Sequence, residues 1–163
     1  MLPIEWVGVT HIAAGARHAP VKLETGAIVT NLPTDRLFLF PQHRVLVTSA
    51  IVRRMFRCDS VFVAAKFLSG MKGVSRLETS GRVAHRHILC RTRAVVFAKG
   101  VAVEILLPGP VAMRNLPRLA LTAIASITQH DNSQFAQPCL EAPAQPLRRE
   151  LVARYVNYSK QLA

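Results

Sequence analysis

The first candidate for chemistry is one histidine, His43, in the segment DRLFLFPQHRVLV (Asp35 to Val47). Leu37 to Phe40 is a continuous apolar run, typical of a strand covered on both faces, and Val45 to Val47 is a second run rich in β-branched residues. Pro41 lacks a backbone donor and favours extended geometry in the residue before it, so the first strand has to end there. The pattern predicts a turn from which the imidazole could face a cleft.

Two more histidines, His85 and His87, are separated by the two-residue period of a strand and therefore share one face of it. Metal binding is one interpretation, but Cys90 points to the other face and no fourth ligand is evident. We expect a packed or solvent-facing pair, with no metal and no cofactor. For His43, two interpretations stay open. It is either a turn histidine that is hydrogen-bonded to backbone, or a residue with a catalytic role.

The three cysteines, Cys58, Cys90 and Cys139, cannot all pair with one another, and no CxxC spacing occurs. Neither a disulfide framework nor a redox motif is indicated. Cys58 and Cys90 have apolar sequence neighbours, so we expect buried rather than reactive thiols.

Composition predicts a folded and basic protein. The 163 residues are 50% hydrophobic and 18% charged, which excludes a disordered chain, and the formal net charge is +12. Arginines occur in groups that could gather into a phosphate-binding surface: Arg53, Arg54 and Arg57; Arg82, Arg86, Arg91 and Arg93; Arg148 and Arg149. Because aromatic residues make up only 6%, base stacking is poorly supported and nonspecific attraction of polyanions is the simpler expectation.

The sequence indicates no membrane association. The first residues lack the basic patch and apolar run of a signal peptide, and the longest uncharged stretches, 105–113 and 119–130, are too short to span a bilayer. We expect a soluble chain that is cytoplasmic by default.

Short strands follow one another closely, which predicts an all-β domain. Within the first segment we expect Ile4, Trp6 and Val7 to point inward. A hairpin is predicted at Lys99–Gly100. The expected strands are 2–9, 21–23, 37–40, 45–47, 74–77, 82–89 and the two arms of 94–106, and residues 60–68 form either a strand or a short strand followed by a helical turn.

The pattern changes at Pro108-Gly109-Pro110, which predicts a β domain over 1–110 and a helical extension over 111–163. The first helix has Asn115 as N-cap and Pro117 in its first turn. Its expected apolar face is Leu116, Leu119, Ala120, Ala123, Ile124 and Ile127. After a proline-rich linker over 129–146, a second helix carries the stripe Leu147, Leu151, Val152 and Tyr155, flanked by Arg148, Arg149, Arg154 and Lys160.

The order of several blocks resembles the bacterial branch of the Hint domains, the all-β fold shared by Hedgehog autoprocessing domains and inteins. The blocks are LPIEWVG (Leu2 to Gly8), FPQHRVLV (Phe40 to Val47), MFRCDSVFVAAKFLSG (Met55 to Gly70), HILCRTRAVVFAKGVAVEILLPG (His87 to Gly109) and QPLRRELVARY (Gln145 to Tyr155). The resemblance implies a mainly β, Hint-like domain without its opening strands, followed by two C-terminal helices.

The resemblance also implies a chemistry. In the family, an opening cysteine or serine attacks the preceding carbonyl in an N–S or N–O acyl shift, and the histidine represented here by His43 hydrogen-bonds and protonates the scissile amide. His87 stands where many relatives also have histidine. The chain as given starts at Met1, after the position of that nucleophile, and no Cys or Ser occurs in its first nine residues, so we expect the nucleophile to be absent.

Further departures from the family pattern point to lost activity. Phe40 stands where Ser or Thr is usual, Arg91 where Asp is common and Arg93 where His is common. The chain ends without an Asn followed by Cys, Ser or Thr at the end of a strand, since Asn115 opens a helix and Asn157 lies in the tail. We therefore expect a degenerate Hint domain with at most vestigial autoproteolysis at His43. The rest of a larger polypeptide would be its partner in cis, and a small basic nucleic-acid-binding or interaction protein is the alternative.

Overall fold

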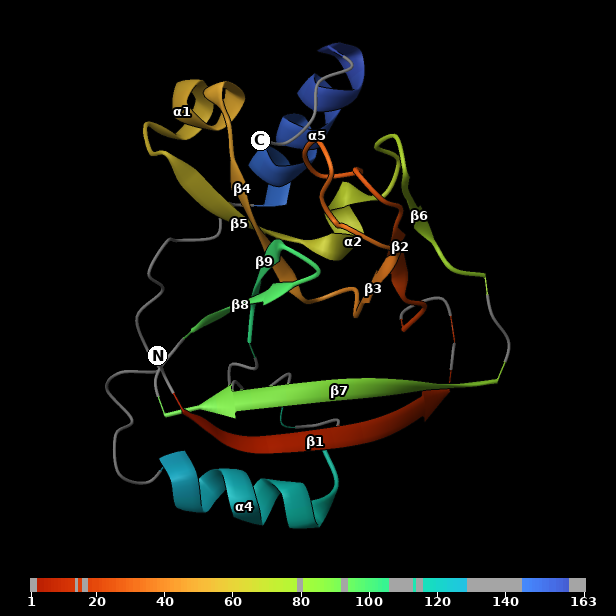
Figure 1. Ribbon diagram of the computed structural model, residues 1–163, viewed down its shortest axis with the longest axis vertical. Coiled ribbons are helices and arrows are strands. Elements are labelled where there is room, and N and C mark those ends of the chain that lie inside the picture. The colour runs from red at the N-terminus through yellow and green to blue at the C-terminus, as the bar shows by residue number, and fades with distance from the viewer. Residues whose placement is uncertain are drawn as a thin grey trace.

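The computed structural model describes residues 3–13, 15, 18–78, 81–91, 94–105, 113, 116–128 and 145–158. The protein is mainly β, as expected, and its strands are all antiparallel where they pair (Figure 1). The strands are β1 (Ile4–Ala13), β2 (Val21–Leu23), β3 (Leu37–Leu39), β4 (Arg44–Thr48), β5 (Ser60–Ala64), β6 (Val74–Arg76), β7 (Arg82–Cys90), β8 (Val95–Ala98) and β9 (Val101–Glu104). The helices are α1 (Ala50–Phe56), α2 (Ala65–Leu68), α4 (Arg118–Thr128) and α5 (Gln145–Tyr158).

The strands form three sheets. Two of them, β3-β2-β6 and β5-β4-β9-β8, make up the body of the molecule together with α1, α2 and α5. The third is a two-stranded ribbon, β1-β7, which crosses the opposite end of the molecule with α4 packed on it (Figure 1). Trp6 and Leu89 of the ribbon pack with Leu116 and Ile124 in a small separate cluster.

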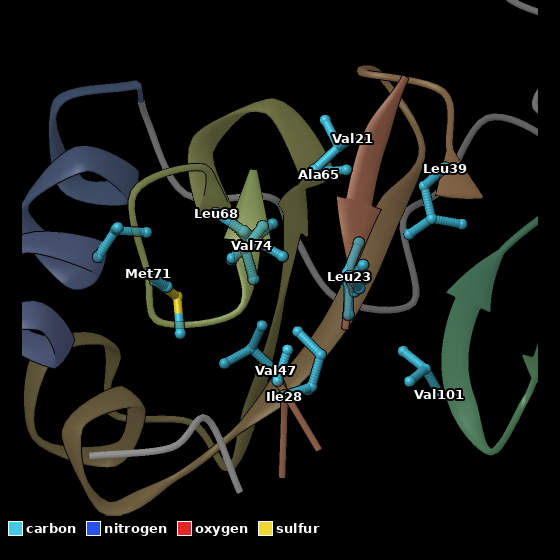
Figure 2. Packing of buried hydrophobic residues seen from close by; sticks show 14 of the residues in the cluster. Val21, Leu23, Ile28, Leu39, Val47, Ala65, Leu68, Met71, Val74 and Val101 are labelled. Carbon is cyan, nitrogen blue, oxygen red and sulfur yellow. The ribbon is translucent and has the colours of Figure 1, made fainter. Parts of the chain in front are cut away.

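The core of the body is one apolar cluster to which both sheets contribute. Figure 2 shows side chains from β2, β3, β4, β6, β9 and α2 meeting there, among them Leu23, Val47 and Leu68. From α5, Leu151, Val152 and Tyr155 join the same cluster. The final helix therefore packs on α1 and α2 of the body through the stripe that the sequence predicted, although its first member, Leu147, is 40% exposed.

Helix α1 was missed in the sequence, where no element was assigned to this segment. Ser49 caps its start by accepting a hydrogen bond from the N–H of Val52 at 3.1 Å, and Arg57 ends it in the left-handed region at φ 57°.

The predicted hairpin is confirmed: Lys99 and Gly100 both have positive φ, 51° and 84°, between β8 and β9.

Several predicted burial positions are wrong. In β1 only Trp6 of the three expected residues is partly covered, whereas Ile4 and Val7 are 57% and 59% exposed. The pairing with β7 shifts register between Ile4 and Trp6, so an irregularity at this point turns Ile4 away from the face of Trp6. Phe38 is 49% exposed, so β3 is covered on one face and not on two.

In the extension, α4 follows Pro117 directly and buries Ile124, but Leu119 of the expected apolar face is 85% exposed. The triplet at 108–110, Asn115, the linker over 129–144, Cys139 and Lys160 lie outside the described residues. The division at residue 110 therefore stays a prediction. None of the described helices is long and apolar enough to cross a membrane.

Candidate functional site

The turn that carries His43 is fixed by backbone hydrogen bonds. The N–H of His43 donates to the carbonyl of Phe40 at 2.9 Å. In the other direction, the carbonyls of His43 and Pro41 accept from the N–H groups of Ala65 and Lys66, at 2.8 and 3.0 Å. The predicted Pro-Gln-His turn therefore exists and is held against the first residues of α2, which sets the direction of the imidazole.

Phe40 lies at the centre of three histidines. Its ring centroid is 5.9 Å from that of His18, which it stacks on with an angle of 10° between planes. The rings of His43 and His85 meet it edge-on, at 6.1 Å and 4.4 Å. These are contact distances for aromatic rings, so Phe40 occupies the space between the imidazoles.

The ribbon supplies the other side of the site. Its inward face carries His85, which is buried, and His87, which is half-buried. Thr10, opposite His85 on β1, places its hydroxyl oxygen 2.9 Å from Nε2 of His87. The predicted shared face of His85 and His87 is thus confirmed, and the pair is a packed one at the junction of ribbon and body.

Burial favours the neutral form of His43, His85 and His87, because it lowers the pKa of each imidazole. Burial, with smaller contributions from the charges of His87 and His85, lowers the pKa of His43 from 6.5 to about 4. Burial likewise lowers the pKa of His85, with His87 and His18 adding to the effect, and burial alone lowers that of His87. Three ring nitrogens, Nδ1 of His18, Nδ1 of His43 and Nε2 of His85, are enclosed without a hydrogen-bond partner among the described residues.

The remaining candidates lie outside this constellation or do not complete it. Arg91 is exposed and forms an ion pair with Glu5 at 3.4 Å, and Arg93 is outside the described residues. Cys58 and Cys90 are free thiols: Cys90 is buried, which raises its pKa, and half-buried Cys58 donates to the carbonyl of Ser60 at 3.4 Å. Among the residues that the structure describes, no group of three His, Cys, Asp or Glu side chains could hold a metal ion.

A second concave region is unrelated to the histidines. A groove of about 920 Å³ lies between the turns at 24–31 and 70–73 and the end of α5, and Glu24, Lys72 and Tyr155 are among its lining residues. Among the described residues, no histidine or cysteine lines it, so this part of the groove contributes neither an imidazole nor a thiol.

The described strands β1 to β9 and the histidine turn all lie within the part of the chain that a known family model matches. A family model described as the Hint domain matches residues 1–110. The chain belongs to the Hint domain family. No curated protein and no solved structure matches this Hint domain closely enough to be informative.

Sequence reasoning identified His43, His85 and His87, but it did not bring them together or include His18. His18 comes from a loop, Phe40 directly follows β3 and His85 comes from the middle of β7. No local pattern links these three segments. The sequence did contain one signal of this arrangement. Phe40 stands where the family pattern has Ser or Thr, and this places a bulky ring next to the histidine turn.

Proposed function

We propose that this Hint domain does not cleave itself and serves as a structural or interaction domain within a larger polypeptide. The observation that carries the proposal is the position of Phe40, whose ring lies against His18, His43 and His85. In an active relative, the histidine of this block has to reach the amide of the bond that breaks. Here the space beside its ring holds a phenyl group.

The chemistry at Phe40 supports the same conclusion. General acid–base catalysis needs the reacting amide within about 2.6–3.2 Å of the imidazole, or one water away. A phenyl ring neither donates nor accepts a conventional hydrogen bond, so it cannot orient that amide or a water in place of the Ser or Thr hydroxyl that the family pattern implies.

The charge state of His43 adds a second argument. To protonate the leaving nitrogen, the imidazole has to carry a proton. With a pKa of about 4, the imidazole is almost entirely neutral at pH 7. His43 is therefore a poor general acid at neutral pH, while its neutral ring packs well against Phe40.

The test is a fusion in which a reporter protein and an opening block with its cysteine precede the chain. We expect no reporter release when the purified fusion is incubated with thiol at pH 7 and 8. The same fusion with that cysteine changed to alanine is the control for background hydrolysis. Release that requires the cysteine and is abolished by His43→Ala would overturn the proposal.

A restored variant shows whether the substituted positions block the reaction. The triple change Phe40→Thr, Arg91→Asp and Arg93→His returns the residue types that the family pattern implies at these positions. We expect measurable thiol-dependent release from this variant and none from Arg91→Asp with Arg93→His alone, because Phe40 then still occupies the space between the histidines. Thermal melting of each fusion checks that the domain is folded.

A further inference from the structure

The outward face of the β1-β7 ribbon is an unusual surface for a small sheet. The two strands are 10 and 9 residues long and pair over nearly their whole length. No other described strand pairs with either of them. At 3.4 Å per residue the ribbon is about 30 Å long, and α4 packs with the inward-facing Trp6 and Leu89 rather than on the outward face.

Aliphatic and basic residues share this outward face. On β1 it presents Val7 and Val9, 59% and 48% exposed, and then His11. Opposite Val9 on β7 stands Arg86, and Arg82 follows four residues earlier on the same face. The inward residues His85 and His87 alternate with these positions, so the outward composition is not a consequence of the histidine site.

The two arginines have unused hydrogen-bonding capacity. Both are exposed, and neither forms an ion pair with a described carboxylate. Among the described residues, Arg82 donates one hydrogen bond, from Nη2 to the carbonyl of His11 at 3.4 Å, and Arg86 makes no contact of this kind. Because the chain as a whole has a net charge of +12, a polyanion is attracted to the molecule and not only to this face.

We propose that the outward face of the β1-β7 ribbon binds the major groove of double-stranded DNA. A two-stranded antiparallel ribbon is one of the two elements that the groove, about 12 Å wide, admits. The ribbon is about as long as one turn of B-form DNA, about 34 Å. An exposed guanidinium can bind the O6 and N7 atoms of guanine, and an aliphatic side chain contacts the methyl group of thymine.

Other occupants fit this face less well. A second copy of the chain would bring a second charge of +12 against Arg82 and Arg86, so like charges oppose self-association. Single strands are recognised largely by stacking on aromatic rings, and the outward positions of the ribbon hold Val, Ile, Ala, Arg and His. The inference is independent of whether the histidine site cleaves peptide bonds, because it uses the opposite face of the ribbon.

The test measures binding of the full chain to a mixed-sequence 20-base-pair DNA by fluorescence anisotropy at 50 and 150 mM salt. We expect Arg82→Gln with Arg86→Gln to weaken binding by about tenfold or more at 150 mM salt, in line with the loss of one or two guanidinium contacts to bases. The matched control removes the same charge from Arg54 on α1 and Arg149 on α5, both exposed and at the other end of the molecule (Figure 1). For that pair we expect a change of less than about twofold.

An RNA duplex of the same sequence separates groove binding from attraction by phosphate alone. Its major groove is deep and narrow, so we expect binding about tenfold weaker than to DNA. The proposal is overturned if the unmodified chain does not bind DNA at 50 mM salt, if both double variants weaken binding equally, or if RNA binds as well as DNA. Binding to vesicles that contain phosphatidylserine without binding to DNA would also overturn it, in favour of a membrane surface.

Discussion

The body of the molecule and the β1-β7 ribbon are held together by different forces. In the body, a cluster of twenty described buried residues joins two sheets and three helices, and its members are apolar apart from the hydroxyl of Tyr155. The corresponding cluster between the ribbon and α4 has three described buried residues, Leu89 of β7, Leu116 and Ile124. At the junction with the body the ribbon instead contributes His85, His87 and Thr10. Hydrophobic burial therefore dominates in the body, whereas the junction between ribbon and body also contains polar side chains, two of them imidazoles.

The largest fall in the free energy of unfolding is expected from a cavity in the core of the body. Leu68, on α2, is fully buried in the large cluster. Leu68→Ala removes its buried methyl groups and leaves a cavity that rigid neighbouring sheets fill only in part. We expect the free energy of unfolding to fall by about 3–4 kcal/mol, measured by urea denaturation.

The matched control is the same substitution at Leu119, a leucine of α4 that is 85% exposed. We expect Leu119→Ala to change the free energy of unfolding by less than about 0.5 kcal/mol. Equal losses at the two positions would mean that the large cluster does not dominate stability and would remove the contrast between body and ribbon.

Protonation of the histidines between ribbon and body is expected to lower the free energy of unfolding somewhat less than this cavity does. The pKa of His43 is about 4 in the folded protein and 6.5 in its ordinary state, so below pH 6.5 the unfolded chain binds more protons than the folded one. The contribution of His43 to stability is complete above pH 6.5 and is lost as the pH falls from 6.5 towards 4. The difference between these two pKa values corresponds to about 3 kcal/mol. The lowered pKa values of His85 and His87 act in the same direction.

Urea denaturation at pH 7.0, 5.5 and 4.5 measures the slope of the free energy of unfolding against pH. His43→Gln cannot take up a proton in this range, so its stability should fall less steeply with pH than that of the unmodified protein. His11→Gln, at an exposed position of β1, is the control and should keep the original slope. If both variants keep it, protonation of the junction does not limit stability in acid.

The sequence predicted most strands and the histidine turn because their signals are local. β-branched runs, Pro41 and the Lys99–Gly100 pair each act over a few residues, and β3, β4 and the β8-β9 hairpin appear where they indicate. The outward position of Ile4 was missed because the register shift between Ile4 and Trp6 arises in the pairing with β7, whereas Val7 points outward by ordinary strand alternation, since its neighbour Trp6 points inward. A strand pattern read alone contains no information on such an irregularity.

Helix α1 and the surroundings of Phe40 were missed for related reasons. The helix contains β-branched Ile51 and Val52, which have weak intrinsic helix propensity, and its stability comes from the Ser49 cap and from packing against α5. The ring contacts of Phe40 join His18, His43 and His85 across 67 positions of the chain, the difference between 85 and 18. Only the folded arrangement brings such distant residues together.

The smallest effect tests the polar attachment of the ribbon directly. Thr10→Val keeps the shape of the side chain but removes the hydroxyl that lies 2.9 Å from Nε2 of His87, which leaves that nitrogen without its partner in a half-buried place. We expect the free energy of unfolding to fall by about 1 kcal/mol, the usual contribution of one hydrogen bond of this kind.

Thr48→Val is the matched control, because Thr48 is exposed at the end of β4, and we expect it to be neutral within about 0.5 kcal/mol. Hydrogen exchange then locates the loss: faster exchange confined to β1 and β7 in Thr10→Val would show that the ribbon opens before the body. A Thr10→Val protein as stable as the unmodified one, with unchanged exchange, would mean that the Trp6 and Leu89 cluster alone holds the ribbon. In that case both regions would be stabilised by apolar burial, and they would differ only in its amount.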